Sequence, residues 1–257
     1  MHFLHAQIAY PIPSSSSLAS TAAADFKNRT PFQNPASWSH CQQAKLVSSL
    51  ESNYAIPELA TKTMMLMYPF KQFVGSFSFA HHGFALYHEM IFASAFTRNF
   101  SDRFSMGLQF NYHNIYIASS ERYAGTLYPQ VGFIIPFTKQ FALGVHLNNP
   151  FAANIKTEYL TKYIPAIYSI GCSHHFSQDF SWRMQVDKEL HSQYRVATAL
   201  DYSMSKYNRV QLGLYVQEVV VPCLGFGIDF KHFSFDLAVE IHPLLGLNNI
   251  AQIQLRL

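Results

Sequence analysis

The sequence predicts an all-β protein, a closed antiparallel transmembrane β-barrel of about 14 strands that follows an irregular N-terminal plug segment. Three observations support this prediction: apolar residues alternate with small or polar ones, few residues carry a charge, and one kind of turn recurs. Charged residues make up 13% of the 257 residues, against about 25% in ordinary soluble domains. A closed barrel pairs its backbone polar groups internally, so it can span a bilayer.

The recurring turn is a short polar segment with an aromatic residue on each side. Its copies span residues 69–73, 99–104, 136–141, 175–180, 204–210 and 230–233, the first and the last two being less regular. Turns of one kind at intervals along the chain predict stacked hairpins that all turn on the same side. The flanking aromatic residues are then expected to form a ring at one membrane interface.

The overall composition excludes several other classes of protein. The net charge of +3 is small, and there is no basic run, so we expect no nucleic-acid partner. No segment approaches the roughly 18 apolar residues of a membrane-spanning helix. Cys41, Cys172 and Cys223 are far apart and odd in number, so we expect unpaired cysteines that pack as small apolar side chains. One disulfide remains an alternative in an oxidising compartment.

The chain divides into three parts by composition. Residues 1–7 could be the remnant of a signal peptide. Residues 8–42 are rich in proline, serine and alanine and have little periodicity, which predicts an irregular segment in the lumen or the periplasm. Residues 43–257 carry the alternating pattern and form the expected barrel.

The period-two pattern sets the expected strands. They span residues 45–54, 60–69, 72–80, 84–98, 103–117, 123–136, 140–148, 163–175, 179–188, 193–204, 208–217, 221–231, 232–241 and 249–257. An even number of strands puts both ends of the chain on one side, together with the recurring turns, and we expect that side to be the periplasm. The longest connection, residues 149–162, falls on the opposite side, as expected for an extracellular loop.

The apolar face of each strand is expected to point outward. A soluble barrel or sandwich would show the same alternation with the apolar face inside. However, the polar face here is rich in glycine, alanine and serine rather than in lysine and glutamate. The apolar runs also match the length of a tilted strand crossing a bilayer, and aromatic residues gather at the strand ends.

Residues 32–37, just before the first expected strand, read Phe-Gln-Asn-Pro-Ala-Ser. An Asn-Pro-Ala motif at this place, followed by about 14 alternating strands, resembles the FadL/PorV superfamily of bacterial outer-membrane proteins. The resemblance covers the architecture of the whole chain but a motif of only Asn34, Pro35 and Ala36. It implies that these residues lie in the lumen and hold the plug. This chain departs from the family in being short, with minimal loops.

The superfamily has two functional branches. FadL-like members pass hydrophobic molecules through a lateral opening in the wall, whereas PorV-like members serve type IX secretion in Bacteroidota. A small barrel with short loops favours the second branch, so we expect an accessory or structural subunit of a secretion or surface assembly. A FadL-like channel for hydrophobic solutes is the alternative. The expected partners are the lipid bilayer, lipopolysaccharide and other membrane or secretion subunits.

Charged residues on the polar faces are candidates for the lumen. They are Arg183, Asp187, Arg195, Asp201, Asp229, Lys231, Asp236, Glu240 and Arg256. The two signs nearly balance, and unpaired buried charge is costly, so we expect pairing across neighbouring strands. Such pairs would stiffen the barrel or anchor the plug; a charged constriction that selects solutes is the alternative.

Three prolines suggest a weak place in the wall. Pro129 and Pro136 fall in one expected strand, and Pro165 falls in the strand beyond the long loop. Proline removes a hydrogen-bond donor from the ladder, so it favours edges and bulges. We expect a wall break around the sixth to eighth strands, suited to a lateral opening or a docking seam. Ordinary bulges near strand ends are the alternative.

Metal binding and catalysis are not expected. Adjacent residues of a strand point to opposite faces, so the pairs His81-His82 and His174-His175 are poorly placed to chelate one ion. No cysteine and histidine spacing typical of zinc sites occurs. Ser177 is close in sequence to His174 and His175 but forms no recognisable catalytic arrangement. We therefore expect no cofactor, and an outer-membrane enzyme is the least favoured function.

Overall fold

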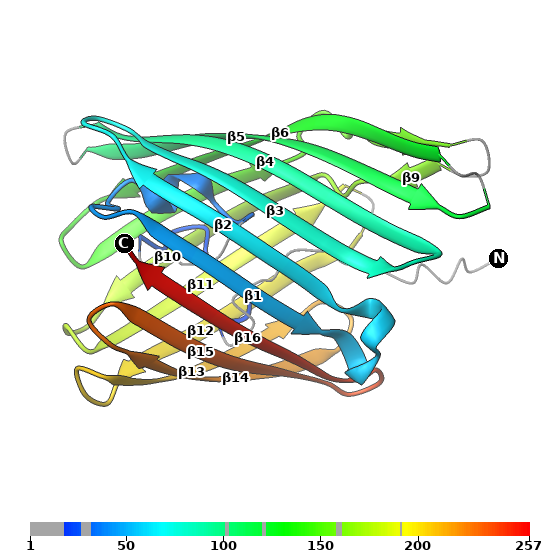
Figure 1. Cartoon of the computed structure of the whole chain (residues 1–257). Helices are drawn as coiled ribbons and strands as arrows, with labels where there is room; N and C mark the ends of the chain where they lie inside the picture. The colour runs from blue at the N-terminus through cyan, green and yellow to red at the C-terminus, as the bar shows by residue number, and fades with distance from the viewer. Residues whose placement is uncertain (1–17, 27–31, 101–102, 120–121, 158–160, 191) are drawn as a thin grey trace.

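Fourteen strands close into one antiparallel barrel in the computed structural model, as the alternation predicts (Figure 1). The structure describes residues 18–26, 32–100, 103–119, 122–157, 161–190 and 192–257. The possible signal-peptide remnant, residues 1–7, lies outside the described residues. Strand β1 closes the barrel by pairing with β16, from Lys45 opposite Arg256 to Ser52 opposite Asn249.

The strands match the expected ranges to within a few residues. In barrel order along the chain they are β1 (Lys45–Ser52), β2 (Thr61–Pro69), β3 (Val74–Phe84), β4 (Tyr87–Phe100), β5 (Phe104–Ile117), β6 (Arg122–Pro136), β7 (Phe141–Asn148), β10 (Ile167–His175), β11 (Phe180–Glu189), β12 (Tyr194–Ser203), β13 (Asn208–Val216), β14 (Val220–Asp229), β15 (Phe233–His242) and β16 (Gly246–Arg256).

One connection differs from its expected form. Residues expected to be loop form a small separate hairpin, β8 (Asn154–Lys156) with β9 (Thr161–Tyr163). The next barrel strand, β10, then begins at Ile167, later than expected. Pro165 lies just before this strand, where its missing N–H removes no bond from the barrel ladder.

The outer surface of the barrel is apolar. Residues of the expected outward set are exposed, among them Leu66, Phe77, Phe96, Ile170 and Leu214. Most of their sequence neighbours are small or polar and point inward, whereas Met65 and Met67 beside Leu66 are buried against Trp38 of the N-terminal segment. This arrangement agrees with the predicted orientation and suits contact with lipid acyl chains. Within the described residues, no helix is long and apolar enough to cross a membrane.

The recurring turns lie together at the end of the barrel where the C-terminus is found (Figure 1). Aromatic rings pair across these turns: Phe100 with Phe104, with ring centroids 4.6 Å apart, and Phe176 with Phe180, 5.4 Å apart. Phe230 contacts Phe233 in the same way, at 4.7 Å. The expected aromatic ring therefore forms. We call this the turn end of the barrel.

The opposite end, which we call the loop end, has its own belt of rings on the outside. His81, His88, Tyr116 and Tyr123 stack in sequence, with centroid distances of 5.5, 4.9 and 4.9 Å. Such amphipathic rings suit the level of lipid headgroups. His82, in contrast, points inward and contacts the hydroxyl of Thr61 at 2.9 Å, so the two neighbouring histidines face opposite sides.

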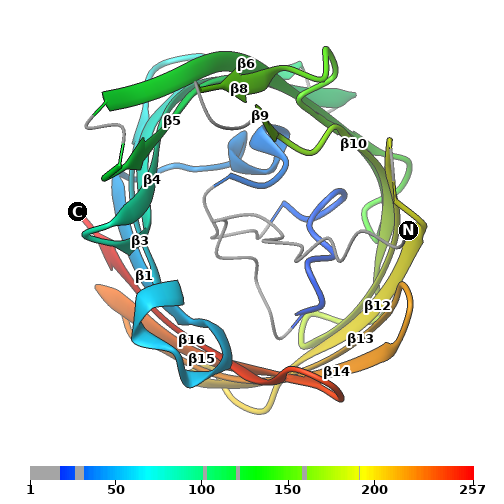
Figure 2. The ribbon, with the colours of Figure 1, turned by 90° about the vertical axis from the view of Figure 1, so that its right-hand side faces the viewer.

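Two short irregular segments sit at the loop end. The connection from β1 to β2 contains two 3-10 helices, η3 (Asn53–Ala55) and η4 (Pro57–Leu59). The β8–β9 hairpin lies beside β6 at the rim (Figure 2). All three cysteines are free, so the alternative of a disulfide does not apply to this structure.

Candidate functional site

The described part of the N-terminal segment lies inside the barrel, which resolves the choice between lumen and periplasm for these residues (Figure 2). Asn34 joins the two described pieces of this segment, residues 18–26 and 32–42, because its Nδ2 donates to the carbonyl oxygen of Ala23 at 2.5 Å. The same amide reaches the wall carbonyl oxygens of Phe133 and Val145, at 3.4 and 3.3 Å. One buried side chain thus fixes the plug to itself and to strands β6 and β7.

The Asn-Pro-Ala motif also starts a short helix, η2 (Pro35–Trp38). Asn34 Oδ1 accepts a hydrogen bond from the backbone N–H of Ala36 at 2.9 Å, which caps the helix. Pro35 occupies the first helical position, where its missing N–H is tolerated. Its carbonyl oxygen accepts from the hydroxyl of Thr97 on β4 at 2.7 Å. The motif residues therefore lie in the lumen and contact the wall.

Three wall glycines make room for this contact: Gly107 on β5, Gly132 on β6 and Gly144 on β7. A Cβ on Gly132 would overlap Asn34 Oδ1, and a Cβ on Gly144 would overlap the carbonyl oxygen of Ala23. A Cβ on Gly107 would overlap the backbone of the motif. Gly107 and Gly132 are register partners on adjacent strands. The plug thus rests directly on the wall backbone.

Arginines of β11 and β12 anchor the plug further along the wall. Arg195 Nη2 donates to the carbonyl oxygen of Ala19 at 2.7 Å. Arg183 pairs with Asp25 of the plug at 3.1 Å, and both side chains are buried. Gln185 Oε1 accepts from a backbone N–H of the plug at 2.8 Å. Plug and wall are therefore joined along the arc of strands from β4 to β12.

The candidate lumen charges, apart from Lys231, lie on inward-facing strand positions. They are Arg183, Asp187, Arg195, Asp201, Asp229, Asp236, Glu240 and Arg256. Arg195 pairs with Asp187 at 2.8 Å, and Arg183 pairs with Asp201 at 3.4 Å. Lys231 instead lies in the exposed turn after β14, because this strand ends at Asp229, two residues earlier than expected.

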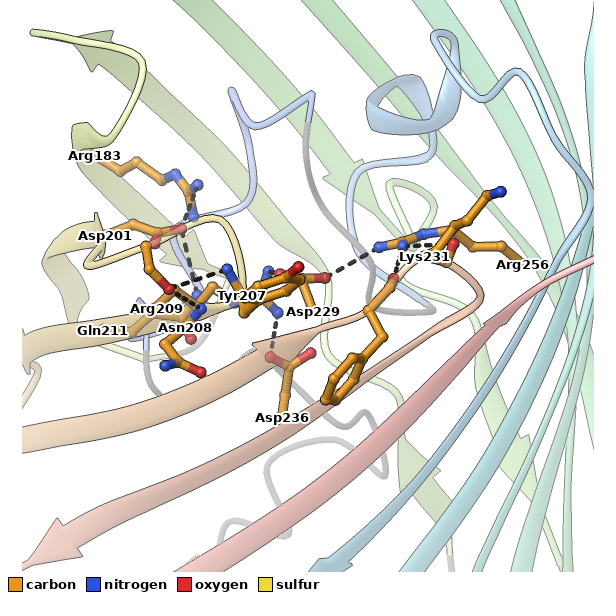
Figure 3. A network of polar contacts seen from close by, with 12 residues as sticks. Arg183, Asp201, Tyr207, Asn208, Arg209, Gln211, Asp229, Lys231, Asp236 and Arg256 are labelled. Atoms are coloured by element: carbon orange, nitrogen blue, oxygen red, sulfur yellow. Dashed lines mark hydrogen bonds and ion pairs between the residues drawn. The ribbon is translucent and has the colours of Figure 1, made fainter.

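Arg209, the one member that the sequence analysis missed, is the centre of a second charge network with three of the expected lumen charges (Figure 3). It pairs with Asp229 at 2.9 Å and also with Asp236. Asp229 in turn pairs with Arg256 at 3.1 Å. Gly227 lies between the two partners, since it is the register neighbour of both Arg209 and Asp236. A Cβ there would meet Arg209 Nε and Asp236 Oδ1, each at 2.5 Å.

The β8–β9 hairpin packs an apolar cluster against the inside of the wall. Ile155 and Ile164 are buried against Ile115 of β5 and Tyr128 of β6. Small and branched neighbours extend the cluster toward the rim. The hairpin therefore covers an apolar part of the lumen at the loop end, above the plug.

A buried ion pair holds this hairpin to the opposite side of the cluster. Lys162 of β9 pairs with Glu89 of β4. Glu89 also contacts His113 Nε2 at 2.8 Å and accepts from the hydroxyl of Tyr87 at 2.6 Å. The sequence analysis missed Glu89 and His113, although both fall on the inward set of their strands.

The wall has an open edge next to the hairpin. Strand β6 pairs with β5 from Arg122 to Ile134, but with β7 only from Gln130 to Pro136. Within the described part of the chain, residues 122–128 therefore have a backbone partner on the β5 side only, and Pro129 is bonded to Asn149 just beyond β7. Tyr123, at the top of this edge, belongs to the outer aromatic belt, so the edge below it faces the apolar layer of the membrane.

The three prolines mark this region. Pro129 lies where the β6–β7 pairing stops, and its carbonyl oxygen accepts from the N–H of Asn149 at 3.1 Å. Pro165 lies before β10 and accepts from Asn148 Nδ2 at 3.0 Å. Pro136 is at the turn end, paired with Ala142. The sixth to eighth barrel strands, β6, β7 and β10, are paired wherever they overlap. Within their described residues, the ladder is missing only at the loop end of β6.

Comparison with known proteins finds relatives by structure alone. No protein-family model and no curated protein matches this chain. A Pseudomonas aeruginosa FadL homologue is 12% identical, with a TM-score of 0.70 over 95% of this chain and 98% of that one. The P. putida toluene transporter TodX is 9% identical, with a TM-score of 0.69 over 94% and 97%. The Acinetobacter baumannii outer membrane protein Omp33 is 7% identical, with a TM-score of 0.55 over 84% and 98%.

These neighbours agree with the FadL side of the expected resemblance. They give no support to an accessory subunit, to type IX secretion or to a source in Bacteroidota, and the FadL-like alternative fits them better. Their descriptions name a FadL homologue, a toluene transporter and an outer membrane protein rather than enzymes, consistent with a non-enzymatic barrel. The chain has the fold of FadL-type outer-membrane barrels.

Proposed function

We propose that this protein is an outer-membrane channel that passes small apolar molecules from its loop end sideways into the membrane. The observation that carries the proposal is the open edge of β6, where, within the described residues, 122–128 lack a backbone partner on the β7 side. Backbone groups at an unpaired strand edge lose their hydrogen bonds in lipid, which is energetically costly. An open edge at this place in the wall therefore favours a functional role for it, such as an exit for solutes.

The lining of the lumen beside this edge supports an apolar solute. Tyr128, on the inner face of the edge, packs with Ile155 and Ile164 of the hairpin segment. An apolar molecule that displaced the hairpin would meet this cluster first and the edge next to it. Transfer of apolar surface from water to such a lining is favourable, at about 25 cal/mol per Å².

The plug supports a sideways route rather than a straight one. Its described residues are bonded along an arc of the wall that runs from β4 to β12, through Asn34 at β6 and β7 and through Arg183 and Arg195 at β11 and β12. A solute at the loop end therefore has an apolar surface beside it and a fixed polar plug below. The structural neighbour TodX is a toluene transporter, which fits the same class of solute.

The proposal is tested by uptake of radiolabelled toluene into cells that carry the protein in their outer membrane. The polar sugar layer of lipopolysaccharide slows apolar molecules, so the channel should raise the initial rate above that of cells without it. Ile155→Asn should raise this gain, because a buried amide costs about 1–3 kcal/mol and weakens the packing that holds the hairpin over the apolar path.

Leu244→Asn is the matched control, because Leu244 is 78% exposed at a loop tip away from the cluster. It should leave the uptake rate unchanged. An equal rate in cells with and without the barrel, at equal amounts of folded protein, would reject the proposed function.

A further inference from the structure

A hollow of about 560 Å³ lies in the rim at the turn end, at the opposite end of the barrel from the β8–β9 hairpin. It is lined by Ser39, Cys41 and Gln42 after η2, by residues 69–74 around the turn from β2 to β3, and by Arg98 and Asn99 near the end of β4. Lys71 and Arg98 are cationic, and none of the described residues that line the hollow is acidic. The hollow therefore suits an anion.

The Arg98 guanidinium is held in place on the outer side of the rim. Thr97 before it is buried, and its hydroxyl donates to the plug, so the alternation of the strand turns Arg98 outward. Its guanidinium carbon lies 5.0 Å from the ring centroids of both Phe73 and Phe100. Its Nη2 donates to Gln72 Oε1 at 3.2 Å. A cation held in this way loses less freedom when it binds an anion.

The outer wall beside the hollow is apolar. The side chains of Phe70, Phe77 and Phe96 are exposed there. The ring of Phe70 lies against Gly75, where a Cβ would meet its Cε2 at 2.9 Å, and Gly75 is the register partner of Phe96. Aromatic residues at the end of a barrel mark the level where lipid headgroups meet the acyl layer. The two cations therefore lie at the headgroup level, next to a surface that suits acyl chains.

From these contacts we propose that the hollow binds the headgroup of an anionic phospholipid from the leaflet next to the turn end. The guanidinium of Arg98 has a planar set of N–H donors that matches phosphate oxygens, and Lys71 adds a second positive charge. The acyl chains would lie on the outer wall beside Phe70 and Phe96. The bound lipid would touch the barrel wall and the end of the plug segment at once, since Gln42 lines the same hollow.

Lipid binding is measurable without any transported solute, so this proposal stands apart from the proposed function. Native mass spectrometry follows the full chain in neutral detergent as phosphatidylglycerol is added, and the first lipid should bind more tightly than later ones. Phosphatidylcholine should bind more weakly, because its headgroup has no net charge. Inorganic phosphate at the same concentration should not displace phosphatidylglycerol, because it lacks the acyl chains.

The variant Lys71→Gln/Arg98→Gln should raise the Kd for phosphatidylglycerol about thirtyfold, because the headgroup loses both cations. Lys139→Gln is the matched control and should bind like the wild type, since Lys139 is the exposed lysine of the corresponding turn between β6 and β7. The comparison of the two lipids needs only the wild type, so it tests the site whether or not a variant folds. Equal affinity of the wild type for both lipids, displacement by inorganic phosphate, or a folded double variant with wild-type affinity would overturn the site.

Discussion

Gly227 illustrates how single residues shape this lumen by the absence of a side chain. It lies between Arg209 and Asp236, whose side chains meet above it. Gly107, Gly132 and Gly144 likewise leave room for the plug to lie directly against the wall. At each of these places the neighbouring atoms approach the glycine backbone so closely that a Cβ would overlap them.

Gly227→Ala should therefore destabilise the barrel by about 1–3 kcal/mol, because the new methyl group overlaps both charged partners. Equilibrium urea unfolding in lipid vesicles measures this change. In the double variant Gly227→Ala/Asp236→Ala the overlap with Asp236 is gone, so the two losses should not add. Fully additive losses would show that Gly227 and Asp236 are not coupled.

The plug motif gives a second prediction at this scale. Asn34→Ala removes the helix cap and leaves the carbonyl oxygen of Ala23 without its partner, at a cost of about 1–3 kcal/mol. Hydrogen exchange in residues 18–26 should become faster, while exchange in the barrel strands stays the same. Gln42→Ala, at an exposed plug position, serves as the control. Unchanged exchange in Asn34→Ala would contradict the role of Asn34.

The sequence predicts most inward residues but not their partners. Arg209 and Glu89 follow the same alternation as the charges that were predicted, so that pattern alone could have found them. Lys231 was misplaced because a strand end two residues off changes a lumen position into a turn position. The contact of Asn34 with two wall carbonyl oxygens depends on glycines far away in sequence, which alternation does not reveal.

At the scale of elements, the barrel strands are predictable and the hairpin is not. Each long strand repeats the alternation often enough to be recognised, and the recurring turns mark its ends. Strands β8 and β9 have three residues each, too few for a period. They are held by tertiary contacts, through Ile155 against the wall and Lys162 against Glu89.

Lys162→Met should loosen this hairpin. Glu89 would keep His113 and Tyr87 but lose its cationic partner from β9, which we expect to raise the open population about tenfold, or about 1.4 kcal/mol. Hydrogen exchange in residues 161–163 and toluene uptake should both increase. Lys156→Met changes an exposed lysine of the same hairpin and should alter neither. An equal rise of exchange and uptake in both variants would show that the pair of Lys162 with Glu89 does not hold the hairpin in place.

At the scale of the whole molecule, the turn end and the loop end are expected to face opposite sides of the membrane. Short turns on the periplasmic side are usual for such barrels. Leu244→Cys, at a loop tip, should react with a membrane-impermeant maleimide on intact cells. Lys231→Cys, in a turn, should react only after the outer membrane is opened. The three native cysteines are replaced in both variants, and the reverse pattern would place the termini outside.

The central claim is a sideways path for apolar molecules beside a fixed plug. The most direct test compares the gain in uptake of toluene with that of a small sugar in the same cells. The account predicts a gain for toluene and none for the sugar, since the plug blocks the straight path and the open edge of β6 leads into lipid. A gain for the sugar equal to that for toluene would contradict it and indicate an open aqueous pore.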